Sequence, residues 1–140
     1  MRRDYFTVDI ASESPDGTPT VRIDYDGPDG ELRERLTTAA DVLDASEIDV
    51  TFRRQPDAST GVLSLTNRLT GEYVLEANVT IELVDSLIEA AEDREDGHYE
   101  VRLTDSTGKS RVYEKRTLLV YDHDGSLLRQ RSLIPGGVEL

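Results

Sequence analysis

Three stretches of this chain alternate apolar and polar residues one by one, and this period of two restricts the fold more than any other feature of the sequence. The stretches cover residues 21–26, 48–53 and 99–104. Successive side chains of a β-strand point to opposite faces, so each stretch predicts a strand with one face on a core and the other in water. Such half-buried strands are typical of antiparallel sheets.

Six further segments are rich in the valine, leucine, tyrosine and threonine that strands favour. They cover residues 5–10, 32–36, 62–66, 73–79, 111–121 and 127–134. Turns that end in glycine separate several of these segments, at 26–30, 67–71, 105–108 and 122–125. Glycine adopts positive φ without steric strain, so the sequence predicts a chain of hairpins.

One segment changes to helical spacing. Its apolar residues are Ile81, Val84, Leu87, Ile88 and Ala91. Thr80 can cap the first turn, and Gly97 can follow the last, so we expect an amphipathic helix over about 81–94. A shorter helical turn is expected over 38–43.

The order of elements predicts an α+β fold: a mainly antiparallel sheet or partly open barrel built from hairpins, with the 81–94 helix packed on it. A length of 140 residues corresponds to a single domain, 1–140. The soft segment 54–61 leaves open a division into two halves.

The residue types that are missing exclude several kinds of chemistry. The chain has no cysteine, which excludes disulfide frameworks, thiolate metal sites and cysteine nucleophiles. The longest apolar run covers residues 118–121 only, whereas a membrane helix needs roughly 20 residues. Asp4 and Asp9 interrupt the stretch that would be apolar in a signal peptide, so we expect a cytoplasmic protein with no membrane partner.

No metal or cofactor is expected either. Asp24, Asp26 and Asp29 resemble the start of a calcium loop, but Pro28 and Arg35 stand where two further ligands would be needed. No glycine-rich phosphate-binding motif is present.

The formal net charge is −13, from 29 acidic and 16 basic residues. All but two of the basic residues are arginine, and aspartate outnumbers glutamate. This composition resembles that of proteins from halophilic archaea, which work in molar salt. Because the Debye length is only about 3 Å in 1 M salt, we interpret the charge as an adaptation to solvent rather than as a sign of a basic partner.

The candidates for catalysis surround one of the two histidines. His123 lies in a turn between Asp122 and Asp124, whose charges favour the imidazolium form. A small hydrolase or ligand-binding enzyme would pair His123 with a carboxylate and with Ser126 or Ser132, but neither serine has the sequence context of a nucleophile. We therefore hold this enzyme as an alternative hypothesis.

The candidates for binding are arginines in two similar segments, 25–36 and 121–133. Each segment runs from Tyr-Asp through an Asp-Gly turn into a predicted strand with two arginines, which are Arg33, Arg35, Arg129 and Arg131. If the two hairpins were neighbours, these side chains would share a sheet face, as an RNA-associated protein would require. Such arginines more often pair with nearby carboxylates, so nucleic acid is an unlikely partner.

The C-terminal tail is a further binding candidate. Pro135 and two glycines break the preceding strand, and Val138 and Leu140 give the tail an apolar ending. The tail could form an edge strand or could dock as a linear peptide in a groove of a partner. From these features we expect a non-enzymatic interaction module, with another protein as partner, that acts through a strand edge, the arginine-bearing hairpins or the tail.

Several phrases of the sequence carry a resemblance to a known family. They are MRRDYFT (1–7), LDASEIDVTFR (43–53), TGVLSLTNRLTGEYVLE (60–76) and LVYDHDGSLLRQRSLIPGGVEL (119–140). With them the chain resembles a family of small haloarchaeal proteins of unknown function over essentially its full length. The resemblance implies a halophilic cytoplasm and brings no activity, cofactor or catalytic residue.

Overall fold

The computed structural model describes residues 3–11, 17–38, 41–56, 59–94 and 97–135. Its strands are β1 (Phe6–Ala11), β2 (Thr20–Tyr25), β3 (Thr37–Thr38), β4 (Asp41–Val42), β5 (Ile48–Arg54), β6 (Thr60–Asn67), β7 (Tyr73–Thr80), β8 (Tyr99–Thr104), β9 (Ser110–Lys115) and β10 (Leu119–Tyr121). Its α-helices are α1 (Glu31–Arg35) and α2 (Ile81–Glu92), and its 3-10 helices are η1 (Arg3–Tyr5), η2 (Ala45–Glu47) and η3 (Arg129–Arg131).

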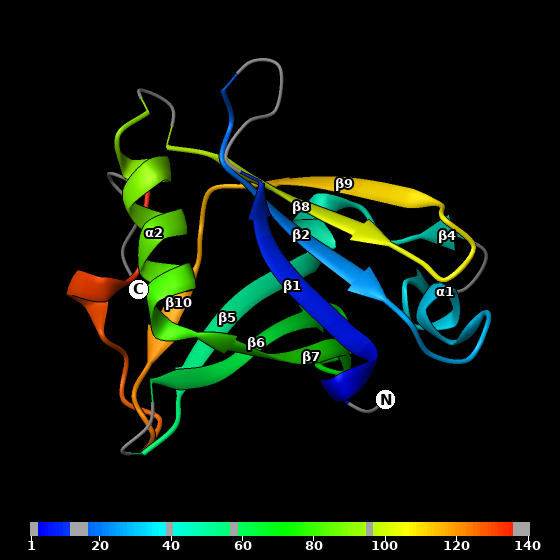
Figure 1. Cartoon of the computed structure of the whole chain (residues 1–140), viewed down its shortest axis with the longest axis horizontal. Coiled ribbons are helices and arrows are strands. Elements are labelled where there is room, and N and C mark those ends of the chain that lie inside the picture. Colours follow the sequence, from blue (N-terminus) through cyan, green and yellow to red (C-terminus); the bar gives the residue numbers. More distant parts are fainter. Residues whose placement is uncertain (1–2, 12–16, 39–40, 57–58, 95–96, 136–140) are drawn as a thin grey trace.

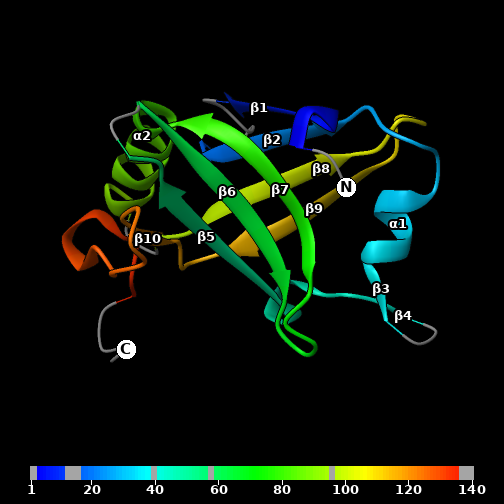
Figure 2. The ribbon, with the colours of Figure 1, turned by 90° about the horizontal axis from the view of Figure 1, so that it is seen from below.

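The strands form two four-stranded sheets and a small two-stranded one. The first sheet has the order β1-β2-β8-β9 and the second the order β10-β5-β6-β7, while β3 pairs with β4. Pairing is antiparallel except between β2 and β8 and between β5 and β10, which run parallel. The predicted α+β fold with mainly antiparallel strands is confirmed, and the two large sheets face one another without closing into a barrel in the described part of the chain (Figures 1 and 2).

The core lies between the two large sheets, where the alternating residues meet. Val21, Ile23 and Tyr25 of β2 are almost completely buried, as are Val50 and Phe52 of β5. The partners of these strands add further buried side chains, among them Leu63, Leu65, Tyr99, Val101 and Leu103. The polar residues of each alternation point away from this core, as the period of two predicts.

Helix α2 closes one end of the space between the sheets, and α1 lies at the other end (Figure 1). The Thr80 hydroxyl accepts a hydrogen bond from the backbone N–H of Leu83 at 3.1 Å, which satisfies one of the unpaired donors of the first turn. Val84, Leu87, Ile88 and Ala91 form the buried face of α2. The predicted helix, its cap and its apolar face are confirmed, with the end two residues earlier than expected.

Four local predictions are wrong. The segment 32–36, expected to be a strand, lies in helix α1, because Leu32 and Leu36 are four residues apart and both become buried on one helical face. In place of the helical turn expected over 38–43, the described residues form the end of β3 and all of β4, with residues 39–40 outside the described part. The segment 127–134 forms η3 between isolated bridges, and 111–121 is divided into β9 and β10.

Candidate functional site

The histidine candidate lies in an open turn after β10. Asp122 Oδ1 accepts hydrogen bonds from the backbone N–H groups of Ser126, at 2.9 Å, and Asp124, at 3.2 Å, so this carboxylate shapes its own turn. The His123 side chain is exposed, and its carbonyl oxygen accepts a hydrogen bond from Arg53 Nη2 at 2.7 Å.

A hollow of about 660 Å³ lies beside this turn. It is lined by Asp122, His123, Arg54, Gln55, Pro56, Ser59, Ile81 and Leu128. Of the two proposed nucleophiles, Ser132 is buried: its hydroxyl donates to Leu128 O at 2.9 Å and accepts from Val120 N–H at 2.8 Å. The other, Ser126, is exposed. Among the contacts of the described residues, no hydrogen bond joins His123 to either hydroxyl.

The four candidate arginines do not share a sheet face, so the condition for a common arginine surface is not met. Arg33 and Arg35 belong to α1, and Arg129 and Arg131 belong to η3, at the opposite end of the molecule in Figure 1. Arg35 Nη1 donates to Tyr73 O at 2.9 Å, and Arg131 Nη1 lies 3.9 Å from Asp85 Oδ2. The two segments that look alike in sequence therefore fold differently, because only the first buries its leucines at helical spacing.

Three other expectations concern the C-terminal tail, metal binding and membrane helices. Val138 and Leu140 lie outside the described residues. Within the described ranges, no group of three or more histidine, aspartate or glutamate side chains is arranged to hold a metal ion. None of the described helices is long and apolar enough to cross a membrane.

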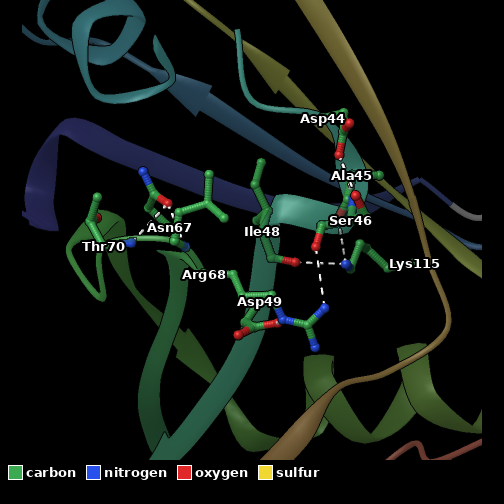
Figure 3. Close-up of polar contacts among 10 residues, drawn as sticks. Asp44, Ala45, Ser46, Ile48, Asp49, Asn67, Arg68, Thr70 and Lys115 are labelled. Carbon is green, nitrogen blue, oxygen red and sulfur yellow. Dashed lines mark hydrogen bonds and ion pairs between the residues drawn. The ribbon is translucent and has the colours of Figure 1, made fainter. Parts of the chain in front are cut away.

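The two large sheets are joined at one side by a lysine (Figure 3). Lys115, the last residue of β9, donates from Nζ to the carbonyl oxygens of Ala45, at 2.7 Å, and Ile48, at 2.6 Å. Those carbonyls belong to η2 and to the start of β5, in the other sheet. Burial lowers the pKa of Lys115 below the ordinary lysine value, while the charges of Asp49 and Asp44 oppose that shift.

Helix η2, which supplies one of these carbonyls, is itself held by a capping box. The Asp44 side chain accepts from the Ser46 N–H at 3.0 Å, and Glu47 Oε1 accepts from the Asp44 N–H at 3.1 Å. Arg68 lies alongside, with Nε 3.5 Å from Asp49 Oδ1 and Nη1 3.4 Å from Ser46 O (Figure 3). The backbone around the Ala45 and Ile48 carbonyls is therefore held by contacts that do not involve Lys115.

A groove of about 720 Å³ runs along this junction, lined by the ends of β5, β9 and β10 and by η2. Its lining carries both signs of charge, with the cations of Arg68, Lys115 and Arg116 and the carboxylates of Asp49 and Glu114. Arg116 is exposed and makes no ion pair within the described part of the chain.

Strand β9 leaves one row of backbone groups without partners. In an antiparallel pair, alternate residues bond to the neighbouring strand and the residues between them point to the other side. The Asp105 N–H donates to Lys109 O at 2.9 Å, so Arg111, Tyr113 and Lys115 bond to β8 and the residues between them point outward. Those residues are Ser110, Val112 and Glu114, and no described strand pairs with that side of β9.

The outer strands β1, β7 and β10 of the two large sheets have neighbours within the protein. Strand β1 lies against β7, and η1 also packs on β7. The edge of β10 is covered by the segment that follows it, since Leu128 N–H donates to Val120 O at 2.8 Å and Leu118 bridges to Leu133. Proteins normally cover or charge such edges because an open one pairs with other chains. Strand β9 contacts η2, but among the described residues no hydrogen bond reaches its outward backbone groups.

The open edge coincides with the most basic segment of an acidic protein. Residues 109–116 contain Lys109, Arg111, Lys115 and Arg116, which include both lysines of the chain, against one carboxylate, that of Glu114. Val112, on the outer face, is 48% exposed. The sequence shows this basic segment directly. A single continuous strand over 111–121, however, predicts neither the open edge nor the position of Lys115 between the two sheets.

Comparisons with known proteins identify a family for this chain but do not indicate an activity. No curated protein and no solved structure matches the chain at a significant level. Residues 1–140 match the family of unknown function DUF5793, so the chain belongs to this family over its whole length.

Proposed function

We propose that this protein is a non-enzymatic interaction module that binds an extended, acidic segment of another protein along the open edge of β9. The observation that carries the proposal is the row of outward backbone groups at Ser110, Val112 and Glu114, within the most basic segment of the chain. An added strand would form main-chain hydrogen bonds with these groups, as in other cases of strand addition to a sheet edge.

The charges around the edge determine which segment fits. Lys109, Arg111 and Arg116 make no ion pair among the described residues, so carboxylates of an incoming strand can pair with them without displacing an internal partner. A second copy of this chain would present its own β9 cations to these, and like charges facing one another across a strand pair are destabilising. The same cations thus favour an acidic partner and disfavour self-association through β9.

We further propose that the protein works in a salt-rich cytoplasm, an assignment supported by its excess of aspartate, its 16 basic residues with only two lysines, and its charge of −13. In about 1 M salt, charges more than about 3 Å apart are screened, so contact pairs and main-chain bonds supply the affinity there.

The experiment compares two labelled peptides, one of alternating glutamate and valine and one of alternating lysine and valine. Fluorescence anisotropy measures their binding to the full chain in about 0.1 M and about 1 M salt. We expect saturable binding of the acidic peptide, weaker at the higher salt, and no binding of the basic one. Absence of acidic binding, or equal binding of both peptides, would overturn the proposal.

Two substitutions of Val112 test whether the peptide binds along the edge of β9. Val112→Pro removes an N–H that points outward, so it leaves the bonds between β8 and β9 intact, whereas Val112→Ala shortens the side chain and keeps the N–H. We expect the proline variant to weaken peptide binding about tenfold relative to the alanine variant. Equal affinities would show that the peptide binds elsewhere. Arg111→Glu, compared with Arg102→Glu on the outer face of β8, tests the charge in the same way.

A further inference from the structure

A second cleft lies between α1 and the hairpin of β8 and β9. These elements lie at the end of the molecule opposite α2 (Figures 1 and 2). Its volume is about 360 Å³, within the range of small-molecule sites in proteins. The loop before α1 is joined to the hairpin turn by a hydrogen bond from Ser106 Oγ to Asp29 Oδ1, at 2.7 Å. The cleft is therefore bounded by two elements that are held together.

The floor of the cleft is hydrocarbon. Leu32 and Leu36 come from α1 and Leu103 from β8, and each is 2% exposed. The two α1 leucines are four residues apart, so they lie on the same face of the helix. Any group that enters the cleft meets the edge of the hydrophobic core.

The rim of the cleft carries three cations: Arg33 from α1, Lys109 from the hairpin turn and Arg111 from β9. Within the described part of the chain, none of the three charged groups makes an ion pair or a side-chain hydrogen bond. The hydrogen bond from the Thr107 hydroxyl is the main cause that lowers the pKa of Asp105, and Lys109 does lie close enough to this carboxyl group for its charge to help. The three side chains together give the mouth of the cleft a positive charge.

The one carboxylate that lines the cleft is engaged in its own turn. Asp105 Oδ1 accepts from the Thr107 N–H at 2.9 Å, the Thr107 hydroxyl at 2.6 Å and the Lys109 N–H at 3.0 Å. These bonds, the Thr107 hydroxyl first, lower the pKa of Asp105. With three cations and one such carboxylate, the lining residues retain a net positive charge.

We infer that this cleft binds a small aliphatic carboxylate, with its hydrocarbon on the three leucines and its carboxylate between Arg33 and Arg111. Guanidinium groups suit a carboxylate because their N–H donors match its two oxygens. Inorganic phosphate would satisfy the cations but would leave the apolar floor unused, so the floor selects for an acid with a hydrocarbon body. This site shares Lys109 and Arg111 with the proposed peptide edge, but it does not use the outward backbone groups of β9 and does not depend on a peptide partner.

The test is a titration of the full chain followed by ¹H–¹³C NMR of leucine methyl groups. The probes are 4-methylpentanoate, its uncharged amide and inorganic phosphate. We expect saturable shifts of the Leu32, Leu36 and Leu103 methyl signals with the acid, and none with the amide or with phosphate. Absence of saturable shifts with the acid, or equal binding of the amide, would overturn the inference.

Charge-removing variants locate the carboxylate. Arg33→Gln and Arg111→Gln should each weaken binding of the acid about tenfold, while Arg22→Gln, on the outer face of β2, should change it less than about twofold. Equal effects of all three substitutions would refute the placement of the carboxylate.

The Val112→Pro variant separates this inference from the proposed function. It should lose affinity for the acidic peptide and keep affinity for 4-methylpentanoate, because its substitution leaves the side chains of the cleft in place. Unchanged peptide binding by this variant would contradict the edge proposal and would leave the cleft inference untouched. In the native protein, absence of acid binding beside normal peptide binding would contradict the cleft inference alone.

Discussion

The contact between Lys115 and the opposite sheet gives a direct prediction about stability. Substitution of Lys115 by methionine keeps most of the hydrocarbon side chain and removes the ammonium group. The carbonyl oxygens of Ala45 and Ile48 then lose their donor, at 2.7 and 2.6 Å in the native protein. Because those carbonyls belong to η2 and β5, the substitution removes a polar link between the two large sheets.

The magnitude follows from the two hydrogen bonds. A bond from a charged donor contributes about 1.5 to 3 kcal/mol when it is fully buried. Lys115 is only partly buried, so water can replace part of each bond and about 1 kcal/mol for each is a realistic value. We expect Lys115→Met to lower the free energy of unfolding by about 2 kcal/mol, which corresponds to a melting temperature lower by roughly 5 to 8 °C for a domain of this size.

The other lysine of the chain provides a matched control. Lys109→Met makes the same change of charge and volume at an exposed position whose ammonium has no hydrogen-bond partner among the described residues. Urea unfolding of the two variants, at equal salt, measures the difference. If both variants unfold within about 0.5 kcal/mol of one another, Lys115 does not hold the sheets together.

The contribution of Lys115 to the free energy of unfolding should depend on pH, and the sign of this dependence follows from the pKa of Lys115. Burial lowers the pKa of Lys115 in the folded protein below the ordinary value of 10.5, so the unfolded chain binds more protons as the pH approaches that value. The free energy of unfolding of the native protein, relative to Lys115→Met, should therefore increase as the pH rises toward 10.5. A neutral amine still donates hydrogen bonds, so the contact itself persists. A decrease over this range would contradict the assigned environment.

Three further predictions concern other parts of the fold. Gly61→Ala should destabilise the protein by about 2 kcal/mol in urea unfolding, because the added Cβ would overlap Arg53 O and the Phe52 ring, and an unchanged midpoint would contradict this packing. Tyr113→Phe should stabilise the protein by about 1 kcal/mol, since the Tyr113 hydroxyl is buried without a partner in the described structure. Tyr99→Phe should destabilise the protein by a similar amount, because it removes the 2.8 Å bond to Thr117 O. Effects of the same sign in urea unfolding would refute the comparison. The melting temperature should fall as salt is diluted from about 1 M to 0.1 M, because surface carboxylates then repel one another over a Debye length near 10 Å, and a constant value would count against the halophilic assignment.

The features that followed from the sequence are those set by local periodicity and composition. Alternation predicted the strands β2, β5 and β8 with their buried and exposed faces, and helical spacing with Thr80 predicted α2 and its cap. The Asp-Ser-Thr-Gly turn predicted the hairpin of β8 and β9. In each case a few adjacent residues determine both the backbone conformation and the face that is buried, so no distant contact is needed.

Tertiary contacts decided the rest. The segment 32–36 is too short for its period to distinguish a strand from a helix, and it becomes α1 because Leu32 and Leu36 both reach the core from one helical face. The parallel pairing of β2 with β8 and of β5 with β10 joins segments far apart in the chain, which no local pattern specifies.

The candidate site depends on those long-range pairings. The sequence by itself placed both lysines and two arginines in residues 109–116, and it also supplied the excess of carboxylates elsewhere. Only the order of strands made β9 an edge and brought Lys115 to the carbonyls of the opposite sheet. Whether a backbone donor is open depends on which strand lies beside it, and that neighbour comes from a distant part of the chain.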